Sequence, residues 1–173
     1  MKAWLLILVI VALSNPPLTS AQANASNDLN TLLRDASYVF NRFEEVSAGI
    51  DAQIDTTYPV PLRKSTKGAL SAILKNVETE KAALNALLGQ TNVSSVDLLD
   101  VYIELVEVAS ELNVESSNSN DWGDQKLAND LAQIGAKAAV LGAKLAATLR
   151  SQIEVQEVQL ALCRQNAPSH KSK

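Results

Sequence analysis

Five carboxylates recur at three- and four-residue intervals in the middle of this 173-residue chain. They are Asp97, Asp100, Glu104, Glu107 and Glu111. Helical spacing places all of them within an arc of about 80° on one helix face. Such a row can dock a basic partner, but a divalent cation needs oxygen ligands that converge from several directions. A solvated acidic surface is therefore the favoured interpretation, with Lys75, Lys81, Lys137 and Lys144 of neighbouring helices beside it.

The chain has few of the residue types on which metal, haem, thiol and serine-hydrolase sites depend. The chain has one histidine, His170, and one cysteine, Cys163. Di-metal carboxylate bundles use Glu-x-x-His pairs, and covalent haem attachment uses C-x-x-C-H. Neither pattern occurs, and neither do the phosphate-binding, dinucleotide-binding or serine-hydrolase motifs. We therefore expect no metal site, no cofactor and no enzyme activity, with a hydrolase based on carboxylates alone as the least favoured alternative.

Cys163 has no second cysteine in the chain with which to form a disulfide. In an oxidising compartment such a thiol is buried, capped or paired with another chain. Its place near the C-terminus makes Cys163 a candidate for an intermolecular disulfide.

Residues 1–23 have the pattern of a cleavable signal peptide. Lys2 precedes an unbroken apolar run from Trp4 to Leu13, and small residues follow. Cleavage after Ala21 or Ala23 satisfies the small-x-small rule. The run is shorter than the roughly 20 apolar residues that span a bilayer. We therefore expect a secreted or periplasmic protein that has no stable membrane anchor after cleavage.

The remaining residues suit one domain. The whole chain is 47% hydrophobic and 20% charged, a composition typical of globular proteins. Cleavage leaves 14 Lys+Arg against 19 Asp+Glu, and this acidic balance disfavours nucleic acid as a partner. We expect a single domain over residues 24–165 and a disordered tail over residues 166–173.

Helical periodicity predicts the first two helices. Residues 27–55 carry apolar residues at alternating intervals of three and four, the spacing of a coiled-coil seam. That seam consists of Leu29, Leu32, Ala36, Val39, Phe43, Val46 and Ile50. Pro59 and Pro61 then force an extended turn. The second helix is predicted over residues 62–88, with Gly89 as its C-terminal cap.

The third predicted helix, over residues 96–114, has more apolar surface than a simple bundle needs. Its apolar positions cover about 220° of the helix circumference. Ser94 and Asp97 resemble a capping box at its start. The helix is therefore either central or has a face meant for a partner, and residues 115–124 are predicted to form a polar linker after it.

The fourth predicted helix, over residues 125–164, has two adjacent seams. One consists of large residues, and the other is made of small residues that allow close helix approach. The small seam consists of Ala128, Ala132, Gly135, Ala139, Gly142 and Ala146. Two interpretations stay open for Gly135, Ala139, Gly142 and Ala146: tight packing inside the chain's own bundle, or an interface between two copies.

These elements predict an all-α fold, arranged as an up-down-up-down four-helix bundle with a long C-terminal helix. The favoured function is an exported, non-catalytic binding or structural module that acts through helix–helix contacts, either with a protein partner or by self-association. The alternative is an extracytoplasmic carrier of a lipid or another apolar small molecule, using the faces of the third and fourth helices.

Export predicts a defined N-terminus. Mass spectrometry of the protein recovered from its own host should find chains that begin at Gln22 or Asn24, because signal peptidase cuts after the small residues Ala21 or Ala23. Recovery of only the uncut chain, beginning at Met1, would contradict the predicted signal peptide.

Overall fold

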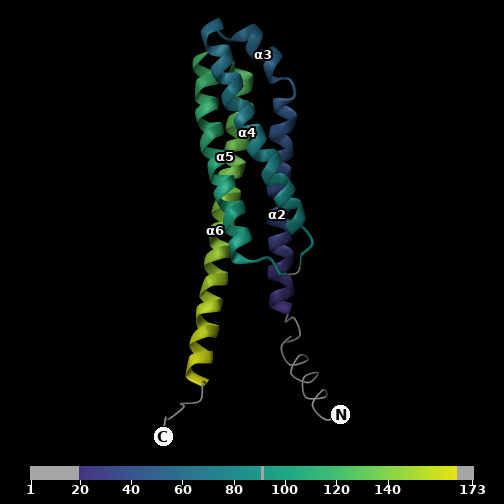
Figure 1. Cartoon of the computed structure of the whole chain (residues 1–173), viewed down its shortest axis with the longest axis vertical. Helices are drawn as coiled ribbons and strands as arrows, with labels where there is room; N and C mark the ends of the chain where they lie inside the picture. Colours follow the sequence, from purple (N-terminus) through teal and green to yellow (C-terminus); the bar gives the residue numbers. More distant parts are fainter. Residues whose placement is uncertain (1–19, 91, 167–173) are drawn as a thin grey trace.

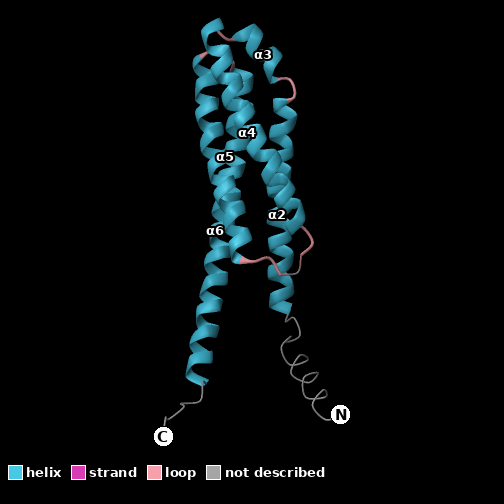
Figure 2. Ribbon diagram, in the orientation of Figure 1, coloured by secondary structure: helices cyan, strands magenta, loops and turns pink. Residues whose placement is uncertain are grey.

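The computed structural model describes residues 20–90 and 92–166, which form five α-helices and no strand (Figures 1 and 2). The helices are α2 (Ser20–Ser47), α3 (Ile50–Thr57), α4 (Val60–Leu87), α5 (Ser95–Asp121) and α6 (Gln125–Asn166). The predicted all-α class is confirmed. The predicted signal peptide and C-terminal tail lie outside the described residues, except for positions 20–23 and 166.

The four long helices lie side by side along the long axis of the molecule, and α3 lies at one end (Figure 1). The most extensive contact joins α5 to α6, while α2 packs against α4 and α6, and α4 packs against α5. All five helices contribute to one buried apolar cluster. At the end opposite α3, the last turns of α6 continue well past the first turn of α5 (Figure 1).

The prediction of one continuous helix over residues 27–55 is wrong, because the structure has two helices there, α2 and α3. The chain leaves α2 after Ser47 and starts α3 at Ile50, with Gly49 as the N-cap residue. Glycine inside a helix is less favourable than alanine by about 1 kcal/mol, so a break here is inexpensive. The break turns Ile50 and Ile54 into the core, where both are buried.

The inner face of α2 is also wider than the predicted seam. Leu33 and Phe40 are fully buried although neither belongs to that seam. Leu32 and Val46, which do belong to it, are only partly buried. The helix therefore buries a broad apolar face against α4 and α6 instead of a single narrow line.

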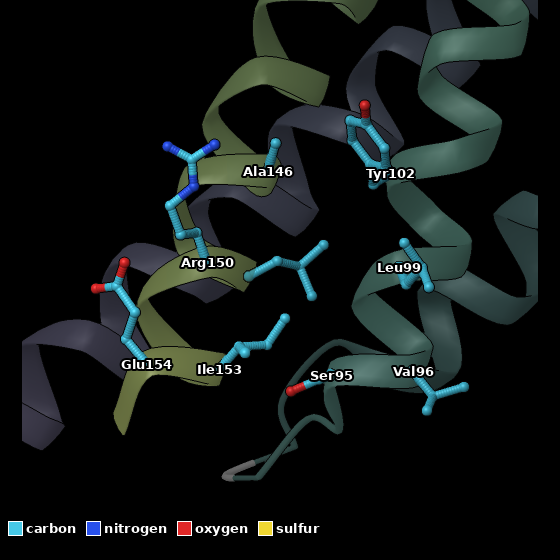
Figure 3. Close-up of a pocket in the computed structure, with 9 residues that line it drawn as sticks. Ser95, Val96, Leu99, Tyr102, Ala146, Arg150, Ile153 and Glu154 are labelled. Carbon is cyan, nitrogen blue, oxygen red and sulfur yellow. The ribbon is translucent and has the colours of Figure 1, made fainter. Parts of the chain in front are cut away.

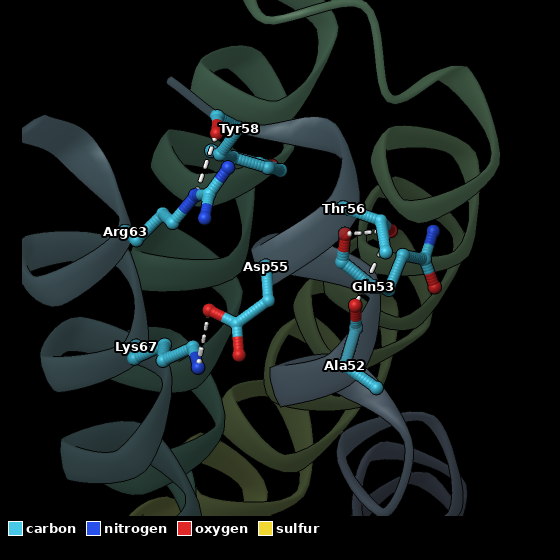
Figure 4. Close-up of polar contacts among 7 residues, drawn as sticks. All are labelled: Ala52, Gln53, Asp55, Thr56, Tyr58, Arg63 and Lys67. Carbon is cyan, nitrogen blue, oxygen red and sulfur yellow. Dashed lines mark hydrogen bonds and ion pairs between the residues drawn. The ribbon is translucent and has the colours of Figure 1, made fainter. Parts of the chain in front are cut away.

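The corner between α3 and α4 is held by polar contacts (Figure 4). Arg63 Nε donates a hydrogen bond to the Tyr58 carbonyl oxygen over 2.8 Å. Lys67 Nζ lies 2.8 Å from Asp55 Oδ1. Both cations come from the first turns of α4, so they tie this helix to the chain that precedes it.

The boundaries of α4 and α5 agree with the predicted caps. Gly89 follows α4 with φ +86°, a left-handed conformation that favours glycine. Ser94 Oγ accepts a hydrogen bond from the Asp97 backbone N–H over 3.1 Å. The same hydroxyl donates to Asp97 Oδ2 over 2.6 Å, so only half of the classical capping box is present.

The polar linker predicted over residues 115–124 is wrong, because α5 continues to Asp121. Two polar residues of this stretch, Glu115 and Ser119, are buried. Ser119 Oγ donates to the Glu115 carbonyl oxygen over 2.7 Å and accepts from Tyr58 Oη over 2.7 Å. A hydrogen-bonded polar residue is tolerated inside the bundle, so its polarity did not indicate a loop.

Asp124 makes the short connection from α5 to α6 and caps α6. Its buried carboxylate accepts the Leu127 backbone N–H over 3.1 Å. Both carboxylate oxygens also accept from Gln53 Nε2, over 2.8 and 2.9 Å. This residue therefore links the start of α6 to α3.

The small-residue seam of α6 is divided between the core and the surface. A Cβ atom at Gly135 would lie 3.3 Å from the Ala109 carbonyl oxygen, and one at Gly142 would lie 3.4 Å from a methyl carbon of Val106. Both glycines therefore face α5 inside the chain, and the contact is tight at Gly135. Ala139 is exposed and Ala146 only partly buried, so these two face outward.

Replacing Gly135 with leucine should lower the free energy of unfolding by about 1–3 kcal/mol, because the side chain must enter a contact with no spare room. The melting temperature measured by circular dichroism checks this. Gly68→Leu is the matched control: Gly68 is exposed on α4 with nothing near its Cβ position, so the better helix former should stabilise by about 0.5–1 kcal/mol. Equal effects at the two positions would contradict the close α5–α6 contact.

Candidate functional site

An open apolar groove lies between the first turns of α5 and the outer part of α6 (Figure 3). Its volume is about 470 Å³. The apolar lining consists of Val96, Leu99 and Tyr102 from α5, and of Ala146, Leu149 and Ile153 from α6. A volume of this size falls in the range of small-ligand sites. We call this feature the α5–α6 groove.

Polar groups lie at the margin of the α5–α6 groove. In Figure 3, Ile153 points across the groove toward α5, whereas Arg150 and Glu154 are directed away from α5. Ser95 Oγ donates to Gln152 Oε1 over 3.1 Å and joins the first turn of α5 to α6. The groove therefore offers an apolar floor with charge along its α6 side.

Beyond this point α6 continues without cover. Every residue from 153 to 165 is exposed, and we call this segment the α6 overhang. It is about 20 Å long at 1.5 Å per residue. Its large apolar side chains are each about half exposed: Ile153 47%, Val155 54%, Val158 59%, Leu160 57% and Leu162 53%.

The apolar residues of the α6 overhang fall on two opposite sides of the helix. At 100° per residue, Leu160 lies within about 20° of Ile153 and so continues the groove side. Val155, Val158 and Leu162 lie roughly 140–200° from Ile153, on the far side. A helix that is apolar on two sides is suited to contact with other helices.

Glu104 of the predicted acidic row is partly buried. Burial, followed by the nearby carboxylates of Glu80 on α4 and of Glu107, Glu111 and Asp100, raises its pKa. Two of the four lysines expected beside the row contact α2 instead. Lys81 pairs with Glu44, and Lys137 lies over the Tyr38 ring, 5.5 Å from its centroid.

The other members of the predicted site are spread over the surface. Asp100, Glu107 and Glu111 are exposed, and Asp97 is partly buried at the start of α5. Cys163 is a free, exposed thiol within the α6 overhang. Over residues 20–90 and 92–166, no group of three or more His, Cys, Asp or Glu side chains is placed to hold a metal ion.

Buried ionisable groups lie at the other end of α5. Burial raises the pKa of the Tyr58 hydroxyl. It is also the main cause of the raised pKa of the Glu115 carboxyl. The Tyr58 hydroxyl is bonded to Ser119 and helps to hold the α3–α4 corner. These groups therefore have a structural role away from the α5–α6 groove.

Of the residues predicted for interaction, only Ala146 lines the α5–α6 groove. Sequence reasoning missed Leu149, Arg150 and Ile153 as site residues. It did indicate Leu99 and Tyr102 indirectly, because both belong to the apolar surplus of the third predicted helix. Predicting the groove requires knowing where α5 begins relative to α6, and no sequence pattern indicates this.

In the part of the chain that the structure describes, no helix has the length and apolar character required to cross a membrane. No protein-family model, no curated protein and no solved structure matches this chain.

The surroundings of Glu104 predict that replacing it with neutral glutamine stabilises the fold in a pH-dependent way. Because the folded-state pKa is raised, the charged carboxylate destabilises the fold above that pKa, and the effect disappears at pH values below the ordinary pKa of glutamate. Glu104→Gln should therefore raise the melting temperature at about pH 7 and change it little at about pH 3.5. The exposed Glu78 on α4 gives a control, since Glu78→Gln should have almost no effect at either pH. An equal gain for Glu104→Gln at both pH values would contradict the electrostatic origin.

Proposed function

We propose that this chain is an exported, non-catalytic module, built as an up-down-up-down four-helix bundle with a long C-terminal helix, that binds through helix–helix contacts. The α6 overhang is the part that makes these contacts. Export rests on the signal-peptide pattern of residues 1–23, and the absence of catalytic motifs favours a binding role.

The single observation that carries the proposal is the uncovered α6 overhang. Helices in proteins gain most of their stability from packing an apolar face against other segments. The α6 overhang is 13 residues of helix, from 153 to 165, with every residue exposed. A neighbouring helix outside this chain would supply the packing that the segment lacks.

A carrier of a lipid or another apolar small molecule is the second candidate, and the α5–α6 groove favours it. The groove has the volume and the apolar lining that such a ligand needs. Of the α6 overhang, only Ile153 and Glu154 line the groove, so a ligand confined there would leave the rest of the overhang uncovered. A helix–helix contact can extend along the overhang and is the stronger candidate.

A photo-cross-linking amino acid at position 160 tests this function in the cells that produce the protein. Leu160 is exposed and lies outside the buried cluster, so the substitution should leave the melting temperature unchanged. We expect a discrete cross-linked protein species after irradiation. Position 71 is the control, because Ser71 is exposed on α4, away from the α6 overhang. Cross-linking from position 160 no stronger than from position 71 would contradict the proposed function.

A further inference from the structure

The groove side of α6 continues directly into the α6 overhang. Around the helix axis, Arg150, Glu157 and Leu160 all lie within about 60° of Ile153. Along the helix this side therefore presents, in order, a cation, an apolar residue, an anion and another apolar residue. When two such helices run antiparallel, the cation of each can face the anion of the other, and apolar residues can meet between them.

We propose that the occupant of the α5–α6 groove is the α6 overhang of a second copy of this chain, running antiparallel to the first. This inference rests on the proposed function and names the partner helix. In a two-fold arrangement each overhang fills the groove of the other copy, so the contact is closed and self-complementary.

The register follows from charge. Placing the two Ile153 side chains at the two-fold axis brings Glu157 of each copy to within one residue of the level of Arg150 of the other. Both residues are exposed, and neither forms an ion pair within the described part of the chain. Each dimer therefore gains two equivalent ion pairs across the contact.

The same register places Leu160 of the second copy over Ala146. Ala146 is small, and it lies in the groove beside the apolar surface of Leu99 and Tyr102. Ala139, one heptad further along α6, is also exposed on this side. The outward-facing half of the small-residue seam thus permits close approach of the incoming helix, while Gly135 and Gly142 serve the contact with α5.

Charge reversal tests the register in sedimentation velocity experiments on the purified chain across the micromolar range. Arg150→Glu and Glu157→Arg should each weaken the dimer at least about tenfold, which is about 1.4 kcal/mol, because each creates two like-charge contacts. The double variant should restore dimer formation, since it re-forms both pairs with exchanged signs. Arg34→Glu, at an exposed position on α2, should leave the dimer intact. Single variants that dimerise as the natural chain does would overturn the register.

Disulfide trapping supplies a second readout. With Cys163→Ser, a cysteine at position 153 should link two copies on mild oxidation, because the two positions meet at the axis. A cysteine at position 155 should not, because Val155 lies on the opposite side of the helix. The two native Cys163 residues would lie about 30 Å apart in this register, at 1.5 Å per residue, and should stay unlinked in the dimer. Linking at position 155 as fast as at position 153 would overturn the arrangement.

Failure of this inference is distinguishable from failure of the proposed function. A monomer at every concentration, together with a cross-linked species from position 160 that contains a different protein, would overturn the second copy as occupant and leave the helix-binding function standing. A monomer that retains the mass of an apolar small molecule in native mass spectrometry, with no cross-linked protein, would overturn both and assign the α5–α6 groove to that ligand.

Discussion

The close contact between α5 and α6 is the constraint on which the rest of the molecule depends. It is the most extensive helix pair in the described part of the chain, and at Gly135 it leaves little room for a side chain. At Gly135 the neighbouring atom is a backbone carbonyl oxygen, that of Ala109, which cannot rotate away as a side chain can. With this pair fixed, α2 and α4 cover the remaining apolar faces and complete the core.

The candidate site is a consequence of unequal helix lengths. Because α5 starts at Ser95, beside Gln152, the residues of α6 beyond this level are left exposed. The α5–α6 groove marks the end of the pair, and the α6 overhang is the part left uncovered. The length mismatch thus leaves apolar side chains of α6 exposed.

The acidic row on α5 shows how surface charge and packing oppose each other in this bundle. Glu104 lies among other carboxylates and is partly buried, although charge repulsion and desolvation both disfavour that position. Lys81 and Lys137 interact with residues of α2 and do not relieve it. The bundle tolerates this local penalty because apolar burial around Leu105 and Leu112, on the inner face of α5, is much larger.

Local sequence patterns were enough to predict the helical class, most of the apolar positions and the caps at Gly89 and Ser94, because three- and four-residue periodicity and capping chemistry are local properties. They could not show that α5 continues through Glu115 and Ser119, since the Ser119 hydroxyl is satisfied by a distant tyrosine. The division of the small-residue seam into a buried half and an exposed half was likewise decided by tertiary structure. Whether a residue such as Gly142 or Ala146 faces the core or solvent depends on where α5 lies, and that position is set by packing between segments far apart in the chain.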